Sequence, residues 1–225
     1  MNRIPFTIYD FFAYLSSGSV LVVTIDYLFG YQWVIKKDMG PSLALFLIFL
    51  SYVAGHCVAH FSSPILEQLF VGTILKRPSH TLMGEPPKPF WAFLFPGYYK
   101  PLPIATQERV WEQARARGFS GSGEALFIHA YAIVTKNENA QKRLDEFRNL
   151  YGFSRNMAFV FLAATALIFL ATFVSENPAS MWWALISCGL GVTMLYRYLK
   201  FFRQFSYQLF ITYAELDKPQ TKKDN

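Results

Sequence analysis

The sequence predicts an all-α fold: a bundle of four transmembrane helices, with a small helical cytoplasmic domain between spans 2 and 3 and a fourth helix that extends into the cytoplasm. Composition is the first reason, because 53% of the 225 residues are apolar and only 16% are charged, against roughly 25% charged in a typical soluble domain. The second reason is that the apolar residues gather in four stretches, each close to the roughly 20 residues that a helix needs to cross a bilayer. The same composition excludes a disordered chain, and two cysteines are too few for a disulfide scaffold.

The four apolar stretches are almost free of charged side chains. Asp26 is the only acidic or basic residue in the first stretch, and the other three contain none. Buried helices of a soluble protein are the alternative, but four of them would leave too little polar surface to cover them. We therefore predict spans at residues 11–35, 42–61, 157–174 and 179–196. They divide the chain into spans 1 and 2 (1–63), a cytoplasmic segment (64–156), spans 3 and 4 (157–196), a cytoplasmic helix extension (197–215) and a disordered tail (216–225).

Basic residues near the ends of the spans predict the orientation, because Lys and Arg are retained on the cytoplasmic side. Lys76 and Arg77 follow the second span, Arg148 and Arg155 precede the third, and Arg197, Lys200 and Arg203 follow the fourth. The loop at residues 175–178 has none, whereas Lys36 and Lys37 in the first external loop break the rule. We expect a multi-pass protein of the bacterial inner membrane with both termini cytoplasmic. The first span should be retained, because acidic residues lie before and inside it and no small-residue cleavage site follows it.

The net charge of +6 does not indicate nucleic-acid binding. In a soluble protein it would raise that hypothesis, but here the basic residues lie beside spans, where anionic lipids attract them. Cys57 and Cys188 both fall inside predicted spans and are best interpreted as small apolar packing residues.

The cytoplasmic segment is too long for a passive connector. Pro64 is expected to kink or restart the helix after span 2. Residues 86–103 hold six of the twelve prolines, interleaved with aromatic residues, so we predict an extended segment along the cytoplasmic membrane face, with a proline-rich ligand for a partner's groove as the alternative. Helices are predicted at about 106–117, 124–134 and 139–151. Thr106 offers an N-cap and Gly118 a stop, and the glycines of 118–123 form a turn because the Gly-Lys-Ser/Thr ending of a phosphate loop is missing.

The fourth helix should continue to about residue 215, since no proline or glycine interrupts it after Tyr196. At 1.5 Å per residue it would be roughly 55 Å long, against about 30 Å of hydrocarbon, so some 20 Å projects or bends along the membrane. Packing against the other cytoplasmic helices would bury its aromatic stripe of Phe201, Phe205, Leu209 and Tyr213. A sister subunit or a partner is the second possibility, and its contact residues would be Lys200, Gln204 and Gln208.

Three runs of sequence resemble a group of small, uncharacterised four-span bacterial inner-membrane proteins. They are Tyr-Val-Ala-Gly-His-Cys-Val-Ala-His-Phe-Ser-Ser from Tyr52, Leu-Tyr-Gly-Phe-Ser-Arg-Asn-Met from Leu150, and Arg-Tyr-Leu-Lys-Phe-Phe-Arg-Gln-Phe-Ser-Tyr from Arg197. The resemblance supplies no activity that could be carried over. Comparable multi-span proteins accompany soluble partners in antiphage defence operons, which is a likeness of architecture.

Asp26, His56 and His60 form the intramembrane polar set, and such residues are functional candidates because charge in hydrocarbon is costly. His56 and His60 are four residues apart, so they share a helix face as two metal ligands would, but no third ligand can be named. Counting from the external ends places Asp26 and His56 at depths of roughly 13 and 20 Å, close enough for a long-range hydrogen bond after modest tilt. The alternatives are neutral histidines bonded between helices with Asp26 satisfied by hydroxyls such as that of Thr24, a proton relay or ion site, and a bound metal.

No motif of a known enzyme class is found in the sequence. We therefore expect no enzyme, no cofactor and no catalytic residues. Gly55, residues 16–19, Gly189 and Gly191 supply small surfaces for close helix approach within the bundle or between subunits. The leading hypothesis is an oligomeric protein that anchors or senses for a soluble cytoplasmic partner. The alternatives are an ion-conducting or membrane-permeabilising effector and, behind it, a membrane-embedded enzyme.

Overall fold

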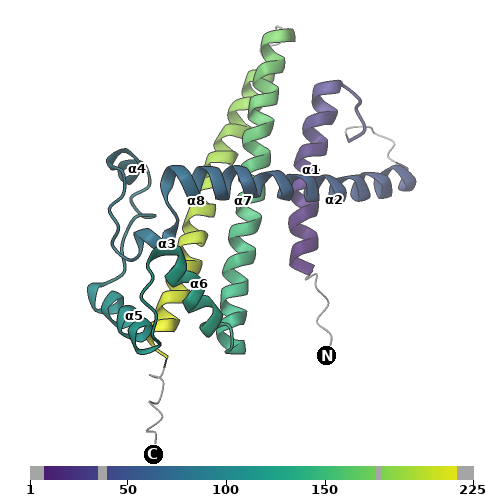
Figure 1. Cartoon of the computed structure of the whole chain (residues 1–225). Coiled ribbons are helices and arrows are strands. Elements are labelled where there is room, and N and C mark those ends of the chain that lie inside the picture. Colours follow the sequence, from purple (N-terminus) through teal and green to yellow (C-terminus); the bar gives the residue numbers. More distant parts are fainter. Residues whose placement is uncertain (1–7, 35–39, 176–178, 217–225) are drawn as a thin grey trace, which may run out of the picture. The chain divides into compact units, whose positions relative to one another are not determined.

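A computed structural model describes residues 8–34, 40–175 and 179–216, and every regular element among them is helical (Figure 1). This confirms the all-α prediction for the described residues. The chain divides into two compact units, of which the first comprises residues 1–69 and 149–198 and the second residues 70–148 and 199–225. The elements are α1 (Ile8–Phe29), α2 (Pro41–Ser62), the π-helix η1 (Ser63–Leu75), α3 (Pro78–Thr81), α4 (Pro89–Leu94), α5 (Ile104–Ala116), α6 (Gly123–Val134), α7 (Glu138–Ser175) and α8 (Ala179–Ala214).

Three helical runs of the described residues are long and apolar enough to cross a membrane: Tyr9–Phe29, Pro41–Thr81 and Glu138–Thr172. The second predicted span, 42–61, lies wholly within these runs, and the third, 157–174, lies within α7. The first is shorter than predicted, because α1 ends at Phe29 and not near residue 35. α8 is not among these runs. The fourth span therefore stays a prediction. Lys36 and Lys37, the loop at 176–178 and the tail from 217 lie outside the described residues.

Two predicted helix ends are absent, because each helix runs on into its neighbour. α2 passes directly into η1, where Pro64 was expected to kink or restart the helix. In an α-helix, proline lacks the N–H that would bond the carbonyl four residues earlier, and its ring clashes with that carbonyl. A π-helix pairs each N–H with the carbonyl five residues earlier, so the α-helical pairing that proline disrupts is not required. α7 joins the predicted helix 139–151 to the third span. A single Gly152 separates the two patterns, and one glycine inside a helix costs only about 1 kcal/mol.

In the first unit α1 and α2 touch backbone to backbone. A Cβ at Gly55 would overlap the carbonyl oxygen of Tyr14, and a Cβ at Gly18 would overlap that of Ser51. Ser17 and Ser51 are also buried there. Small residues allow this approach, which gives many van der Waals contacts in a lipid environment that offers no hydrophobic driving force. The close approach predicted for Gly55 and residues 16–19 therefore occurs between these two helices of one chain.

The second unit has its own core, built from α5, α6 and the last part of α8. Val110, Leu126 and Leu209 are among its fully buried side chains. α5 ends as predicted at Gly118, which has φ +70, and the N–H groups of Gly118 and Phe119 bond the carbonyls of Arg115 and Ala114 at 2.9 Å each, the pattern of a Schellman cap. α5 begins earlier than the predicted cap at Thr106, because Pro103 occupies the N-cap position.

The proline-rich stretch is partly helical, which differs from the extended segment expected. Pro89 opens α4 in its first helical turn, where a missing N–H costs no hydrogen bond. The stretch is fastened to the end of η1, because the Tyr99 hydroxyl donates to the carbonyl of Leu75 and the Tyr98 hydroxyl to that of Lys76, both at 2.8 Å. Burial raises the pKa of Tyr99 to about 12, so this donor keeps its proton at neutral pH.

Candidate functional site

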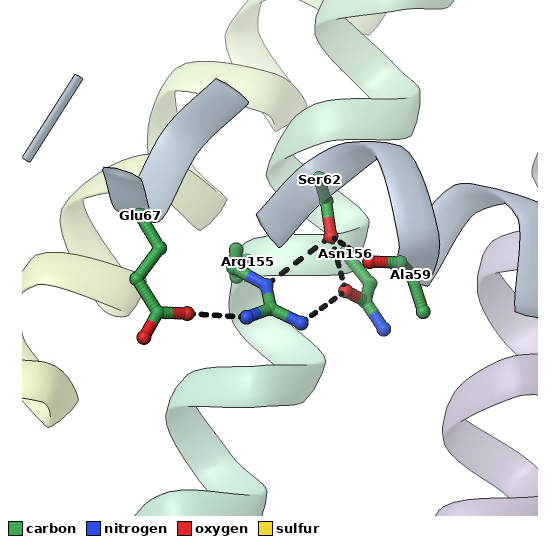
Figure 2. A network of polar contacts seen from close by, with 5 residues as sticks. All are labelled: Ala59, Ser62, Glu67, Arg155 and Asn156. Atoms are coloured by element: carbon green, nitrogen blue, oxygen red, sulfur yellow. Dashed lines mark hydrogen bonds and ion pairs between the residues drawn. The ribbon is translucent and has the colours of Figure 1, made fainter. Parts of the chain in front are cut away.

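A polar network joins the end of α2 and the start of η1 to α7 inside the first unit (Figure 2). Arg155 of α7 is its centre. Its Nη1 donates to Glu67 Oε2 at 2.5 Å, its Nε to Ser62 Oγ at 3.2 Å and its Nη2 to Asn156 Oδ1 at 3.4 Å. The Ser62 hydroxyl faces two acceptors, Asn156 Oδ1 at 2.7 Å and the carbonyl of Ala59 at 3.1 Å. One guanidinium and one hydroxyl therefore connect residues that are about 90 positions apart in the sequence.

The network is largely withdrawn from solvent. Ser62 is 0% and Asn156 4% exposed, and the side chains of Arg155 and Glu67 are 14% and 26% exposed. Each charge loses hydration at such a position, and the loss is tolerated where the partner and the remaining donors are satisfied. Three donor nitrogens of Arg155 have acceptors, as a buried guanidinium requires. The arrangement fixes η1 against α7 in one register.

Both helices leave the first unit close to this network. Glu67 lies just before residue 69, where the chain passes from the first unit into the second, and Arg155 lies one to two turns after residue 149, where α7 enters the first unit. The ion pair of Arg155 and Glu67 therefore joins η1 to α7 within the first unit, close to the points where the chain leaves and re-enters that unit. Chemically the set can position helices or respond to charge, and it contains no nucleophile with an adjacent base.

Asp26 lies near the end of α1 and is 3% exposed. Its carboxylate accepts the backbone N–H of Trp33 through Oδ1 at 2.9 Å and that of Val34 through Oδ2 at 3.3 Å. Thr24 does not serve as its donor, because that hydroxyl donates to the carbonyl of Val20 at 2.7 Å. The carboxylate thus satisfies the amides of the turn that follows its own helix, in place of the hydroxyl or histidine partner that was weighed.

His56 and His60 lie on α2 in different surroundings. The His56 ring stacks on Tyr14 of α1 with centroids 4.2 Å apart and meets Tyr52 edge-on at 4.7 Å. His60 is exposed and its ring contacts the edge of Phe61 at 5.5 Å. Among the described residues no three His, Cys, Asp or Glu side chains lie together as ligands for a metal.

The structure does not bring Asp26 and His56 together. His56 packs on Tyr14, and Asp26 lies twelve residues further along α1, a distance of about 18 Å along the helix axis. Counting depth from the predicted external ends gave a different result because it assumes that both helices start at one plane and run antiparallel. The glycine contact between α1 and α2 sets the register instead.

We expect His56→Ala to lower the melting temperature in detergent and His60→Ala to leave it nearly unchanged. Aromatic pairs contribute about 0.5–1.5 kcal/mol each, and His56 makes two of them, whereas an exposed substitution usually stays within about 0.5 kcal/mol. Metal analysis of the wild type and of the double variant should find none bound. Stoichiometric zinc or iron that disappears in the double variant would contradict this structural role.

A cavity of about 450 Å³ opens between α1, α7 and α8 in the first unit. Its wall is mainly apolar, with residues such as Val23, Ile168 and Trp183, and Asp26 is one of its few polar lining residues. Its size is that of an ordinary ligand pocket. An apolar wall of this kind suits a hydrocarbon group and cannot replace the hydration shell of an ion.

The predicted contact residues of α8 lie in the second unit and face outward to different degrees. Lys200 is exposed, and Gln204 and Gln208 are half-buried. The Gln208 amide donates to Thr212 Oγ1 of its own helix at 3.3 Å. The buried residues of this part of α8 include Leu199, Phe202, Phe205, Ser206, Leu209, Phe210 and Tyr213. Three residues of the predicted aromatic stripe are therefore buried, and the fourth, Phe201, is half-buried.

Reasoning from sequence missed the polar network as a unit. Arg155 served only as an orientation marker, and no acidic partner was identified for it. The usable signal was the position of both residues: an acid just after the second predicted span and a base just before the third, both at the same predicted membrane face. Opposite charges at one face of adjacent spans are expected to pair.

No protein-family model, characterised protein or solved structure matches this chain. The site therefore has to be interpreted from its own geometry.

Proposed function

We propose that this chain is a non-enzymatic inner-membrane protein that anchors a helical module and uses the module to hold or sense a soluble cytoplasmic partner. The module is the second unit, with α3 to α6, the start of α7 and the end of α8. The observation that carries the proposal is that α7 and α8 each run as one unbroken helix from the apolar first unit into the second. A continuous helix transmits a tilt or shift along its length, which a flexible linker does not.

The polar network in the first unit is the second observation that supports this function. It fastens η1 to α7 near the places where both enter or leave the first unit. A network that holds two helices in one register lets a movement of one helix act on the other. The defence setting comes from the resemblance of the three sequence runs alone, so capture of the native complex and identification of the co-purifying protein is the experiment that names the partner.

The proposed topology has four spans and places both termini and the module in the cytoplasm. A cysteine at Asn177 in a chain carrying Cys57→Ala and Cys188→Ala should react with an impermeant maleimide on intact cells. A cysteine at Ser122, an exposed position of the module, should react only after the membrane is opened. Labelling of the cysteine at Ser122 on intact cells would show that the module lies outside the cell. It would contradict both the predicted orientation and the proposed cytosolic partner.

The outward side of α8 is the proposed contact with a sister subunit or the partner. Replacing Lys200, Gln204 and Gln208 together by Ala should shift the assembly to smaller species or release the partner. The fold should survive, because the buried residues of α8 are untouched and the hydrogen bond that is lost, from Gln208 to Thr212, lies within the same helix. Size-exclusion light scattering measures the assembly, and an unaltered mass with the partner still attached would defeat this assignment.

The second candidate function, ion conduction, is favoured by one observation. Arg155 and Glu67 place two charges among helices that are apolar enough to cross a membrane, and such residues often mark ion pathways. Purified protein in liposomes distinguishes the two candidates. Silence under a membrane potential is expected of an anchor, whereas a conductance of the purified wild-type protein would establish the channel.

A further inference from the structure

The short helix α4 presents an apolar surface that the second unit does not cover. Phe93 is 86%, Phe90 65% and Leu94 39% exposed, and no residue of α4 is buried. Trp91 is half-buried: it meets Phe90 edge-on at 4.9 Å, stacks with Phe95 at 6.3 Å and meets Phe70 edge-on at 6.1 Å. One aromatic residue thus fastens α4 to the unit while its neighbours face outward.

The ring that Trp91 contacts belongs to a candidate membrane helix. Phe70 lies in the helical run Pro41–Thr81, which is long and apolar enough to cross a bilayer. The segment that follows α4 is bonded to the end of η1 in the same run, through the Tyr98 and Tyr99 hydroxyls. α4 is therefore held beside the last part of that run, where the first basic residues, Lys76 and Arg77, follow it.

The charged residues nearest to α4 on either side in the sequence are Lys88 and Lys100, and the next ones outward are Glu85, which pairs with Lys76 at 3.5 Å, and Glu108. Lys88 at its start and Lys100 beyond its end are both exposed, and residues 86–107 contain no acidic side chain. Anionic lipid headgroups attract such lysines, and aromatic side chains favour the boundary between headgroups and hydrocarbon. A groove on a soluble protein would meet the same rings but would not explain why they lie between two lysines, beside the end of a helical run that is apolar enough to cross a membrane.

We infer that α4 lies in the headgroup layer of the membrane in which the chain is anchored. Phe90, Phe93 and Leu94 enter the acyl boundary, and Lys88 and Lys100 bind the phosphates of anionic lipids. This interfacial contact fixes the module to the membrane surface in addition to the helices that run into it, as an amphipathic surface segment does. The inference rests on the proposed function, because it requires the chain to be anchored in a bilayer.

A probe that reports lipid contact tests this in the full chain. An environment-sensitive fluorophore is attached to a cysteine at Phe93, at Leu170 or at Ser120, in the background lacking Cys57 and Cys188. Leu170 is 62% exposed on α7 within a candidate membrane run, and Ser120 is exposed at the turn between α5 and α6. The protein is reconstituted in vesicles of phosphatidylcholine with phosphatidylglycerol, with spin-labelled lipid as quencher.

The probes at Leu170 and Phe93 should be quenched by the lipid label and the probe at Ser120 should not. Lys88→Gln should lower the ratio of inserted to free α4 by about fivefold in the anionic vesicles. A Phe93 probe that behaves like the one at Ser120 would overturn the inference. So would one shielded from aqueous iodide yet insensitive to the lipid label, because a protein or a second copy would then cover α4. An unquenched probe at Leu170 would instead overturn the membrane anchoring itself.

Discussion

A single methyl group added at Gly55 is expected to force α1 away from α2 and to lower the melting temperature by roughly 5–10 °C. The Cβ of Gly55→Ala would overlap the carbonyl oxygen and carbon of Tyr14, which are backbone atoms and cannot rotate away. Overpacking that moves backbone usually costs about 1–3 kcal/mol, and separating the helices also loses the stacking of His56 on Tyr14. Thermal unfolding in detergent, followed by size-exclusion fluorescence, measures the loss.

Gly189→Ala is the matched control for this change. It adds the same methyl group to a helix in the first unit, but nothing lies within 4 Å of its Cβ. Alanine also favours helix more than glycine does, by roughly 1 kcal/mol, so this variant should be as stable as the wild type or more stable. Equal stability of the two variants would contradict the backbone contact between α1 and α2. Gly18→Ala combined with Gly55→Ala should lower the stability by less than the sum of the two single changes. The separation of α1 from α2 that one methyl group forces also makes room for the other.

The long apolar helices of this fold could be predicted from the sequence, because a helix that crosses a membrane has to meet few requirements. A helix in hydrocarbon satisfies its own backbone, so length and the absence of charge are enough to locate it. The end of α5 at Gly118 could also be predicted, because the left-handed residue that ends a helix is commonly glycine. Small residues at Gly55 and Ser17 likewise indicated close approach, although they did not specify which helix would approach.

What could not be predicted depends on the register between helices. Asp26 accepts amides of the turn after α1, and no periodicity of the sequence predicts that turn. Pro64 indicated a disturbance of the helix but not its replacement by a π-helix. Arg155 and Glu67 were each visible as charges, yet their pairing requires that η1 and α7 lie side by side. Local patterns fix an element, whereas pairings across elements depend on the packing of the whole unit.

Removing the charge of Arg155 is expected to destabilise the first unit strongly. Arg155→Met leaves Glu67 without its partner and withdraws a donor from Ser62. Breaking a fully buried pair costs about 3–5 kcal/mol, and since the Glu67 side chain is 26% exposed we expect a smaller loss, about 2–3 kcal/mol. That corresponds to a melting temperature lower by roughly 4–12 °C for a chain of this size. Thermal unfolding of purified protein measures it.

A double variant separates two causes of this destabilisation: the unpaired charge left on Glu67 and the removal of the Arg155 side chain itself. Adding Glu67→Gln to Arg155→Met removes the unpaired charge, so the double variant should recover part of the stability that the single variant loses, because an isolated buried carboxylate is the costly state. Arg148→Met is the matched control on the same helix. Arg148 pairs with Asp145 at 2.9 Å but its side chain is 50% exposed, and exposed pairs contribute at most about 1 kcal/mol. If the double variant were no more stable than Arg155→Met, the charge of Glu67 would not be the reason for the loss. If Arg148→Met cost as much as Arg155→Met, the buried network would have no special role in holding η1 to α7.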